Sequence, residues 1–343
     1  MSQIVTLTVA EVVQETEDAR SIVFEVPAEH TGAFAYAPGQ FLTLRIPSDR
    51  TGSVARCYSL SSAPHEGRVQ VTVKRTDGGY GSNWVCDELR AGSAIEVLAP
   101  SGVFCPASLD GDFLLFAAGS GITPVISILK SALERGGGRV VLVYANRDEK
   151  SVIFARALAE LAARHPERLV VLHWLESLQG LPRPEQLREL VRPYAGHEAF
   201  LCGPAPFMAA AKTALAELNV PRDRVHVEKF QSLTGNPFEA GAAEPEPEAV
   251  DAGTTQLTVD LDGETRQVAW PRQRKLLDHL LAEGLDAPYS CREGQCSACA
   301  CRLVAGEVKM LNNEVLDAED IADGIVLACQ SVPLTDEVSV SYE

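Results

Sequence analysis

The chain reads Ser290-Cys-Arg-Glu-Gly-Gln-Cys296-Ser-Ala-Cys299 near its C-terminal end, and a fourth cysteine follows in Leu327-Ala-Cys329-Gln330. A C-x4-C-x2-C run with a distant fourth cysteine is the spacing of plant-type [2Fe–2S] sites. Gly294 and its small neighbours let backbone N–H groups approach the inorganic sulfides. The spacing therefore predicts a cluster with the ligands Cys291, Cys296, Cys299 and Cys329.

A structural zinc site is the alternative for these cysteines. Zinc sites favour two short C-x2-C pairs, whereas the long loop before Cys296 fits a cluster better. Cys301 follows in an alternating run and is predicted to be a small core residue. Cys86 and Cys105 have no partner at ligand spacing, and we expect them to be packing residues.

Residues 1–108 contain short apolar runs separated by Gly, Pro, Ser and Asp. Many short strands at this spacing are typical of a small barrel or sandwich. We expect an antiparallel β-barrel. The expected strands cover Ile4–Val9, Ile22–Val26, Phe41–Ile46, Val69–Lys74 and Ile95–Leu98.

Residues 109–230 change to strands that alternate with helices, which predicts an α/β domain with a doubly wound parallel sheet. The expected strands are Phe113–Ala118, Val140–Tyr144, Leu169–Trp174 and Ala199–Cys202. The expected helices are Pro124–Glu134 and Ser151–Arg164.

Residues 231–254 are predicted to be a linker. Glu239–Thr254 is rich in Ala, Pro, Gly and acidic residues and lacks aromatics, so it should be extended and poorly packed. Residues 255–343 form the last domain. They open with a hairpin that turns at Asp262-Gly263, and a helix over Lys275–Glu283 then stops at Gly284.

The formal net charge is −17, and the last domain and its linker carry most of it. This excess of acids argues against nucleic-acid binding and suits docking to a basic protein surface, although it also simply favours solubility. The sequence has no apolar run long enough for a membrane span. Its N-terminal stretch lacks the basic start of a signal peptide. We expect a cytoplasmic location, no membrane partner and reduced thiols.

The last domain resembles a plant-type ferredoxin. The stretch from Met310-Leu-Asn-Asn313 to Leu327-Ala-Cys-Gln330 is similar to the ferredoxin tails of bacterial oxygenase reductases. The resemblance implies a β-grasp fold for residues 255–343.

Arg56-Cys-Tyr-Ser59, followed by Gly79-Tyr-Gly-Ser82, resembles the flavin signature of the ferredoxin–NADP⁺ reductase superfamily. A guanidinium pairs well with the FAD pyrophosphate, and Tyr58 offers an aromatic face to the isoalloxazine. A helix over Ser82–Leu89 would present free N–H groups to a phosphate. The resemblance implies that Ser59 bonds near the flavin N5. The predicted FAD site comprises Arg56, Cys57, Tyr58, Ser59, Val73, Lys74, Gly81 and Ser82.

A nucleotide site is predicted at Gly119-Ser-Gly-Ile-Thr-Pro124, which follows an apolar strand. The G-x-G-x-x-P form departs from the general dinucleotide fingerprint but is the form found in the reductase superfamily. Thr123 is expected to cap the next helix, with Pro124 at its first position. The predicted nucleotide residues are Gly119, Ser120, Gly121, Thr123, Pro124, Asn146, Arg147, Cys202, Gly203 and Pro204.

Four residues are predicted to act where nicotinamide meets flavin, all by resemblance. Cys202 opens the superfamily's C-G-P-x-P motif, and Glu228-Lys-Phe230 closes the second domain. Phe230 would cover the flavin ring until nicotinamide displaces it; the plain alternatives are a buried thiol for Cys202 and a core phenylalanine for Phe230. The predicted catalytic residues are Ser59, Cys202, Glu228 and Phe230.

The whole chain resembles the reductase components of bacterial 3-ketosteroid 9α-hydroxylase systems, on the stretches Gly52–Ser59, Tyr144–Asp148, Leu172–Gly180 and Ser290–Cys296. The resemblance implies an oxidoreductase that passes electrons from NADH through FAD and a [2Fe–2S] cluster to a Rieske oxygenase. NADPH is less favoured, since Asp148 suits a ribose hydroxyl although Arg147 suits a 2′-phosphate.

Three other functions remain open from the sequence. A reductase component of the phenylacetyl-CoA epoxidase type shares the domain order and would serve a di-iron acceptor. A pure ferredoxin-like electron carrier would need no working flavin site, which the intact Arg56 and Gly119 oppose. A relative of flavohaemoglobin reductase domains would need no cluster.

Overall fold

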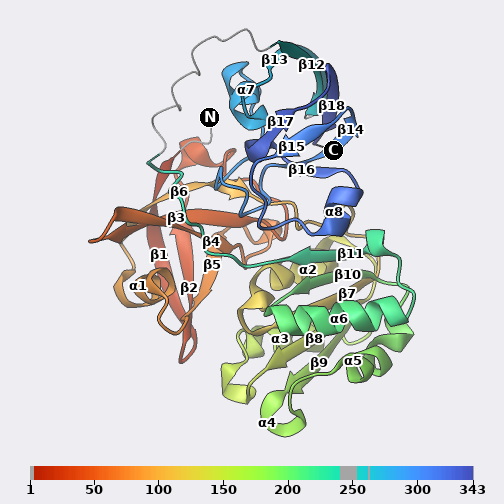
Figure 1. The fold of residues 1–343 in the computed structure, drawn as a ribbon. Helices are drawn as coiled ribbons and strands as arrows, with labels where there is room; N and C mark the ends of the chain where they lie inside the picture. The colour runs from red at the N-terminus through yellow and green to blue at the C-terminus, as the bar shows by residue number, and fades with distance from the viewer. Residues whose placement is uncertain (1–3, 240–252, 262, 343) are drawn as a thin grey trace.

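The computed structural model describes residues 4–239, 253–261 and 263–342, and it divides into three sheet-centred parts (Figure 1). The strands of the first part are antiparallel and lie in the order β4-β3-β6-β1-β2-β5. A bridge between Leu60 and Val71 connects the two outer strands, so the sheet curls into a barrel. The strands are β1 (Val5–Thr16), β2 (Ala19–Glu25), β3 (Phe41–Ser48), β4 (Gly52–Ser59), β5 (Val69–Lys74) and β6 (Ala94–Ser101).

The barrel follows from the alternation of side chains along its strands. In β1, Val5, Leu7 and Val9 are buried while the residues between them are exposed. Helix α1 (Tyr80–Glu88) closes one side through Val85 and Cys86. The predicted barrel is confirmed.

Two details of the barrel differ from the sequence expectation. Strand β4 was not among the expected strands, and Arg56–Ser59 forms its end, where each residue pairs with one of Phe41–Leu44 on β3. Helix α1 begins at Tyr80 rather than at Ser82. β4 was not expected, because Gly, Ser and Arg interrupt its apolar residues and leave no continuous or regularly alternating run.

The second part is a parallel sheet with the strand order β11-β10-β7-β8-β9. Helices α2 (Ile122–Arg135) and α3 (Ala155–Arg164) pack in one apolar core, while α5 (Pro184–Val191) and α6 (Ala205–Glu217) pack in another. The predicted doubly wound fold is confirmed. Its strands are β7 (Phe113–Ala118), β8 (Val140–Asn146), β9 (Leu169–Leu175), β10 (Glu198–Cys202) and β11 (Val225–Glu228).

The helix predicted over Ser151–Arg164 begins later, at Ala155. Asp148 accepts a hydrogen bond from the Ser151 N–H and ends the preceding strand in a short 3₁₀ turn. Phe154 then has a φ of 62°, in the left-handed region, which separates that turn from α3.

The third part is a mixed sheet with the strand order β13-β12-β18-β14-β16, against which α7 (Leu276–Ala282) packs. The hairpin of β12 (Thr254–Leu261) and β13 (Glu264–Pro271) is as predicted, although position 262 of its turn lies outside the described residues. Gly284 has a φ of 76° at the predicted helix stop. The other strands are β14 (Ala300–Ala305), β15 (Val308–Met310), β16 (Ile325–Leu327), β17 (Ser331–Pro333) and β18 (Glu337–Ser341).

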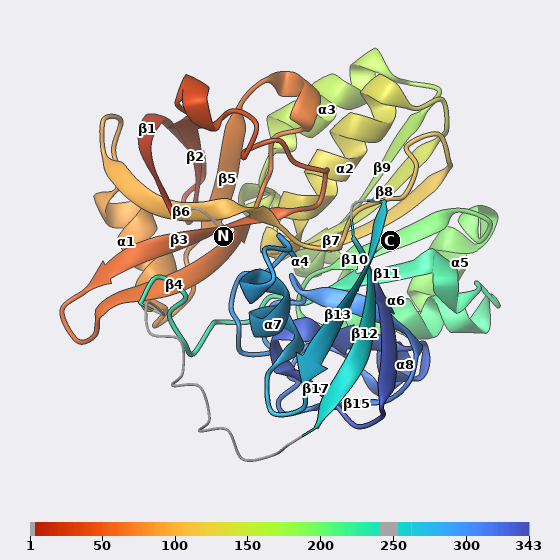
Figure 2. The same ribbon diagram turned by 90° about the horizontal axis from the view of Figure 1, so that it is seen from above.

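The third part sits over the junction of the other two (Figures 1 and 2). The segment 229–239 runs from β11 beneath it, and Leu233 and Phe238 are buried there. The first residues of the range predicted as linker are therefore packed, and residues 240–252 lie outside the described part of the chain. Among the described helices, none has the length and apolar character needed to cross a bilayer.

Candidate functional site

The four predicted cluster ligands are buried at one place. The exposed fractions of Cys291, Cys296, Cys299 and Cys329 are 9% or less. Backbone N–H groups point at their sulfurs: those of Glu293 and Gln295 lie 3.3 Å from the Cys291 Sγ. The N–H of Cys329 lies 3.4 Å from the Cys299 Sγ. These donors fit thiolates that carry a cluster.

The loop achieves this arrangement with left-handed backbone. Arg292, Gly294 and Ser297 have φ values of 61°, 81° and 53°, which turn successive N–H groups inward. A Cβ at Gly294 would lie 2.7 Å from the Asn312 carbonyl oxygen, so only glycine fits there.

Thiol–thiol interactions link the four side chains. Hydrogen bonds with the Cys296 and Cys329 thiols lower the pKa of Cys291, while the same contacts raise the pKa of Cys296 and of Cys329. Among the described residues, no three His, Cys, Asp or Glu side chains surround one point as a single metal ion requires. The cluster assignment rests on spacing, burial and N–H donors instead.

The predicted FAD residues are grouped where β4 meets α1. Arg56 donates hydrogen bonds to the carbonyl oxygens of Ala55 and Leu233, at 2.7 and 3.2 Å. A Cβ at Gly81 would lie 2.8 Å from the Arg56 side chain, so this glycine makes room for the guanidinium. The N-cap of α1, Gly79, has no side-chain cap, which leaves N–H groups free. A guanidinium beside a free helix N-terminus fits a pyrophosphate.

The other predicted flavin residues lie along the neighbouring strands. Ser59 is buried, and burial raises the pKa of Tyr58. The Val73 side chain points into the barrel core, so any contact with FAD is through its backbone. The Lys74 Nζ lies 3.6 Å from the Asp18 carboxylate. The same Nζ is the nearest atom to a Cβ built at Gly119, so Lys74 faces the glycine turn. The Ser82 hydroxyl accepts a hydrogen bond from the Thr76 N–H.

The glycine turn after β7 is as tight as the fingerprint predicts. Gly119 has a φ of 53°, and a Cβ at Gly121 would overlap the Cys202 carbonyl group and the Gly203 N–H. The turn therefore lies directly against the C-G-P motif. Ser120 and Thr123 belong to it, since the Thr123 hydroxyl donates to the Ser120 carbonyl at 3.1 Å.

Thr123 is not the cap of α2, contrary to the sequence expectation. The helix begins at Ile122, its N-cap is Gly121, and Pro124 comes third in the helix rather than first. The 3₁₀ turn of Gly119–Gly121 runs straight into α2, and this brings the helix start forward.

Asn146 ends β8, two residues beyond the expected strand end at Tyr144, and Arg147 follows it. The Asn146 amide is buried, and within the described residues neither its Nδ2 nor its Oδ1 has a hydrogen-bond partner. An orphaned amide at the C-terminal edge of a parallel sheet fits a nucleotide ribose. The Arg147 guanidinium lies 3.4 Å from Asp18 of the barrel.

Cys202 ends β10 and Glu228 ends β11, and the two residues are paired across these neighbouring strands. Phe230 lies just beyond the end of β11. Burial is the main cause of the raised pKa of Cys202, and the nearby Glu228 carboxylate raises it further. Burial raises the pKa of the Glu228 carboxyl to about 8. Phe230 is 50% exposed, so it is not a core residue. Pro204 begins the turn into α6.

A small cavity of about 40 Å³ lies between residues predicted for the flavin site and the predicted cluster loop. Its lining includes Cys57, Ser59, Glu228, Phe230 and the cluster ligand Cys296.

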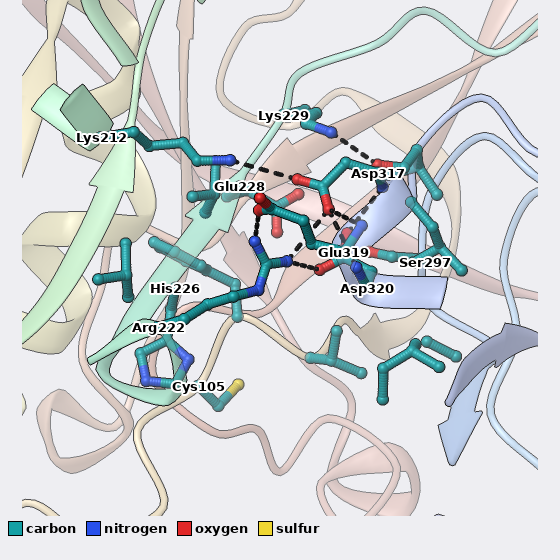
Figure 3. A pocket seen from close by; sticks show the side chains of 18 of the residues that line it. Cys105, Lys212, Arg222, His226, Glu228, Lys229, Ser297, Asp317, Glu319 and Asp320 are labelled. Carbon is teal, nitrogen blue, oxygen red and sulfur yellow. Dashed lines mark hydrogen bonds and ion pairs between the residues drawn. The ribbon is translucent and has the colours of Figure 1, made fainter. Parts of the chain in front are cut away.

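A larger cavity of about 910 Å³ lies between β11 and the third domain (Figure 3). Sequence reasoning missed its polar wall, where Lys212 and Arg222 reach Asp317 at 3.3 and 3.1 Å. Arg222 also pairs with Glu319 and Asp320 on α8 (Ala318–Ala322). Cys105 lines this cavity and is only half-buried, so it is not a plain core residue, whereas Cys86 and Cys301 are. No local sequence motif marks the ion pairs that Lys212 and Arg222 form with the third domain.

Family models match all three parts of the chain. The oxidoreductase FAD-binding domain matches residues 6–105, the oxidoreductase NAD-binding domain residues 115–213, and the 2Fe-2S iron-sulfur cluster binding domain residues 259–334.

The chain is also similar to complete proteins. It is 58% identical over 344 residues to a 3-ketosteroid-9-alpha-monooxygenase ferredoxin reductase component of Rhodococcus rhodochrous, covering 99% of this chain and 97% of the relative. It is 35% identical to a component of the 1,2-phenylacetyl-CoA epoxidase of Escherichia coli, covering 98% and 97%.

Two solved structures have the same arrangement of parts. Full-length CYP116B46 from Tepidiphilus thermophilus matches with a TM-score of 0.66 and 27% identity, over 98% of this chain and 42% of that one. Phthalate dioxygenase reductase matches with a TM-score of 0.57 and 24% identity, over 98% of both chains, which shows the shared fold.

Proposed function

The chain belongs to the family of oxygenase reductases that join FAD-binding, NAD-binding and [2Fe–2S] domains, and we propose that it passes electrons from NADH to a Rieske-type oxygenase acting on a 3-ketosteroid. Its chemistry is that of an NAD(P)H-dependent flavin and iron–sulfur oxidoreductase. The steroid partner is proposed from the 58% identity to the Rhodococcus rhodochrous component, against 35% to the epoxidase component.

The observation that carries the proposed mechanism is the small cavity that Ser59, Glu228 and Phe230 share with Cys296. Residues proposed for the hydride step and a proposed cluster ligand line the same space. FAD, when bound, accepts the two electrons of a hydride and releases them one at a time to a one-electron carrier. The chain's task is to hold the nucleotide, the flavin and the cluster loop in contact.

The nucleotide is held by the turn after β7 in this proposal. Gly119 and Gly121 admit the pyrophosphate close to the backbone at the start of α2. The unsatisfied Asn146 amide bonds the adenine ribose. Arg147 is held by Asp18, which leaves it less free to bind a 2′-phosphate and favours NADH.

Burial keeps the titratable side chains at the nicotinamide end of the proposed site uncharged. The raised pKa of Cys202 keeps its thiol protonated at neutral pH. Glu228, with a pKa of about 8, is also mostly protonated there and is a source or store for a proton at the flavin edge. Ser59 supplies a buried hydroxyl, and the half-exposed Phe230 covers the ring. The proposed domains are 1–108, 109–230 and 255–343, with 231–254 between the last two.

The test is turnover resolved by electron acceptor. The anaerobic holoprotein is mixed with NADH or NADPH, its visible spectrum is followed, and then a steroid Rieske oxygenase or a di-iron epoxidase is added. We expect NADH to bleach the flavin and cluster bands, and only the Rieske oxygenase to restore them. Reoxidation by the di-iron protein alone would move the chain to the epoxidase pathway. No bleaching by either nucleotide would contradict the reductase function itself.

A further inference from the structure

The third domain touches the flavin barrel through a buried pair of hydroxyl groups. The Thr43 Oγ1 on β3 lies 2.7 Å from the Ser290 Oγ, the residue before the first cluster ligand. Both side chains are 1% exposed. Either hydroxyl can donate, and the two residues are 247 positions apart in the chain. We call this the Thr43–Ser290 contact.

Apolar side chains from both domains exclude water around this contact. One core cluster contains residues of the barrel, of the segment after β11 and of the cluster loop. Its buried members are Phe41, Ala55, Leu98, Leu233, Phe238, Cys291, Cys296 and Ala298. A hydrogen bond in such surroundings has no water to compete with it, so losing one partner is costly.

The contact is attached to the strand that carries the flavin signature. Thr43 pairs with Cys57 across the β3–β4 ladder, and the Cys57 Sγ lies 3.4 Å from the Thr43 Oγ1 and 4.0 Å from the Ser290 Oγ. Cys57 stands between Arg56 and Tyr58, and side chains alternate along a strand. The cluster loop thus packs on one face of β4, while Arg56 and Tyr58 occupy the other.

We propose that Thr43 and Ser290 are positioning residues that fix the cluster loop on the flavin-binding strand for internal electron transfer. The inference rests on the proposed function. Each hydride from NADH brings two electrons, so the cluster must be reduced and emptied twice per nucleotide, one electron at a time. A directional hydroxyl pair sets the register of the docked loop, which apolar contacts alone would leave free to slide.

The test separates hydride transfer from internal transfer. Holoprotein carrying Thr43→Val, which keeps the shape but removes the hydroxyl, is mixed anaerobically with NADH in a stopped-flow instrument. We expect flavin bleaching at the wild-type rate and cluster reduction slowed about tenfold, the effect of losing one buried hydrogen bond. Thr43→Ser, which retains the hydroxyl, should restore the wild-type rate. Ser290→Ala is the second variant and should act like Thr43→Val.

A second readout needs no turnover. Hydrogen exchange of the Tyr289–Gln295 peptide should be faster in the oxidised Thr43→Val protein than in wild type, with an unchanged cluster spectrum. Ser131→Ala is the matched control, because Ser131 is a buried serine whose hydroxyl donates to the Ser127 carbonyl within α2. Cluster reduction within about twofold of wild type in Thr43→Val would overturn the inference. Failure of NADH to bleach the wild-type flavin would instead contradict the proposed function.

Discussion

Cys296 and Cys301 are buried cysteines close together in the sequence, but their surroundings differ. The Cys296 Sγ accepts a hydrogen bond from the Cys291 N–H and lies beside other thiols. Cys301 packs in the apolar core of the third domain. We expect Cys296→Ala to lose the cluster, with no iron and no cluster absorbance. Cys301→Ala should keep the full iron content and lose about 1 kcal/mol of stability through a small cavity. Iron analysis and visible spectra check both, and loss of iron in both variants would show that Cys301 is a ligand.

Glu228 should make the stability of the protein depend on pH. Burial raises its pKa from the ordinary value of 4.5 to about 8 in the folded protein. Between these values the folded protein holds more protons than the unfolded chain, so this residue makes stability fall as pH rises. We expect Glu228→Gln to gain stability relative to wild type between about pH 5 and pH 8. Urea unfolding at both pH values measures it. Glu134→Gln, at an exposed position on α2, is the control and should show no such trend.

At the scale of elements, the turn between β7 and α2 depends on β10. A Cβ at Gly121 would overlap the Cys202 carbonyl, so Gly121→Ala must push the turn away from the C-G-P motif. We expect the KM for NADH to rise about tenfold, because the pyrophosphate site and the nicotinamide site separate. Gly137→Ala is the control, since a Cβ there meets nothing within 4 Å. An unchanged KM in Gly121→Ala would show that the two motifs do not act together.

The sequence predicted elements well where the pattern is local. β7 and β8 are continuous apolar runs and were placed within about two residues at each end. β4 was missed because Gly, Ser and Arg interrupt its apolar residues, and β11 because a short edge strand has little pattern of its own. The cluster ligands were proposed from spacing alone, and the structure buries all four cysteines. The Thr43–Ser290 contact could not be predicted, since nothing local relates residues 247 positions apart.

For the whole molecule, Arg222 connects the second and third domains. It pairs with Asp317, Glu319, Asp320 and Asp323. These groups are partly exposed, so the whole set stabilises docking by only about 1 kcal/mol at low salt. We expect Arg222→Glu to loosen the third domain, seen as a larger radius of gyration in low-salt solution scattering.

Salt provides the check on that prediction. At 1 M salt the Debye length is about 3 Å, so exposed ion pairs are strongly screened. The difference in radius of gyration between Arg222→Glu and wild type should therefore shrink at that salt concentration. Arg156→Glu is the matched control, because Arg156 pairs with Glu160 on the same helix and its side chain is 93% exposed. An equal radius for all three proteins at low salt would show that the ion pairs do not hold the domains together.

The burial of the cluster cysteines also sets an order for biogenesis. Cys291 and Cys296 share a core with Leu233 and Phe238, and their exposed fractions are 4% and 9%. An iron–sulfur carrier must touch the thiols it loads, and it cannot reach them once that core has closed. We therefore expect the last domain to receive its cluster before it docks, so that a chain deprived of iron keeps the surfaces buried by docking open to solvent.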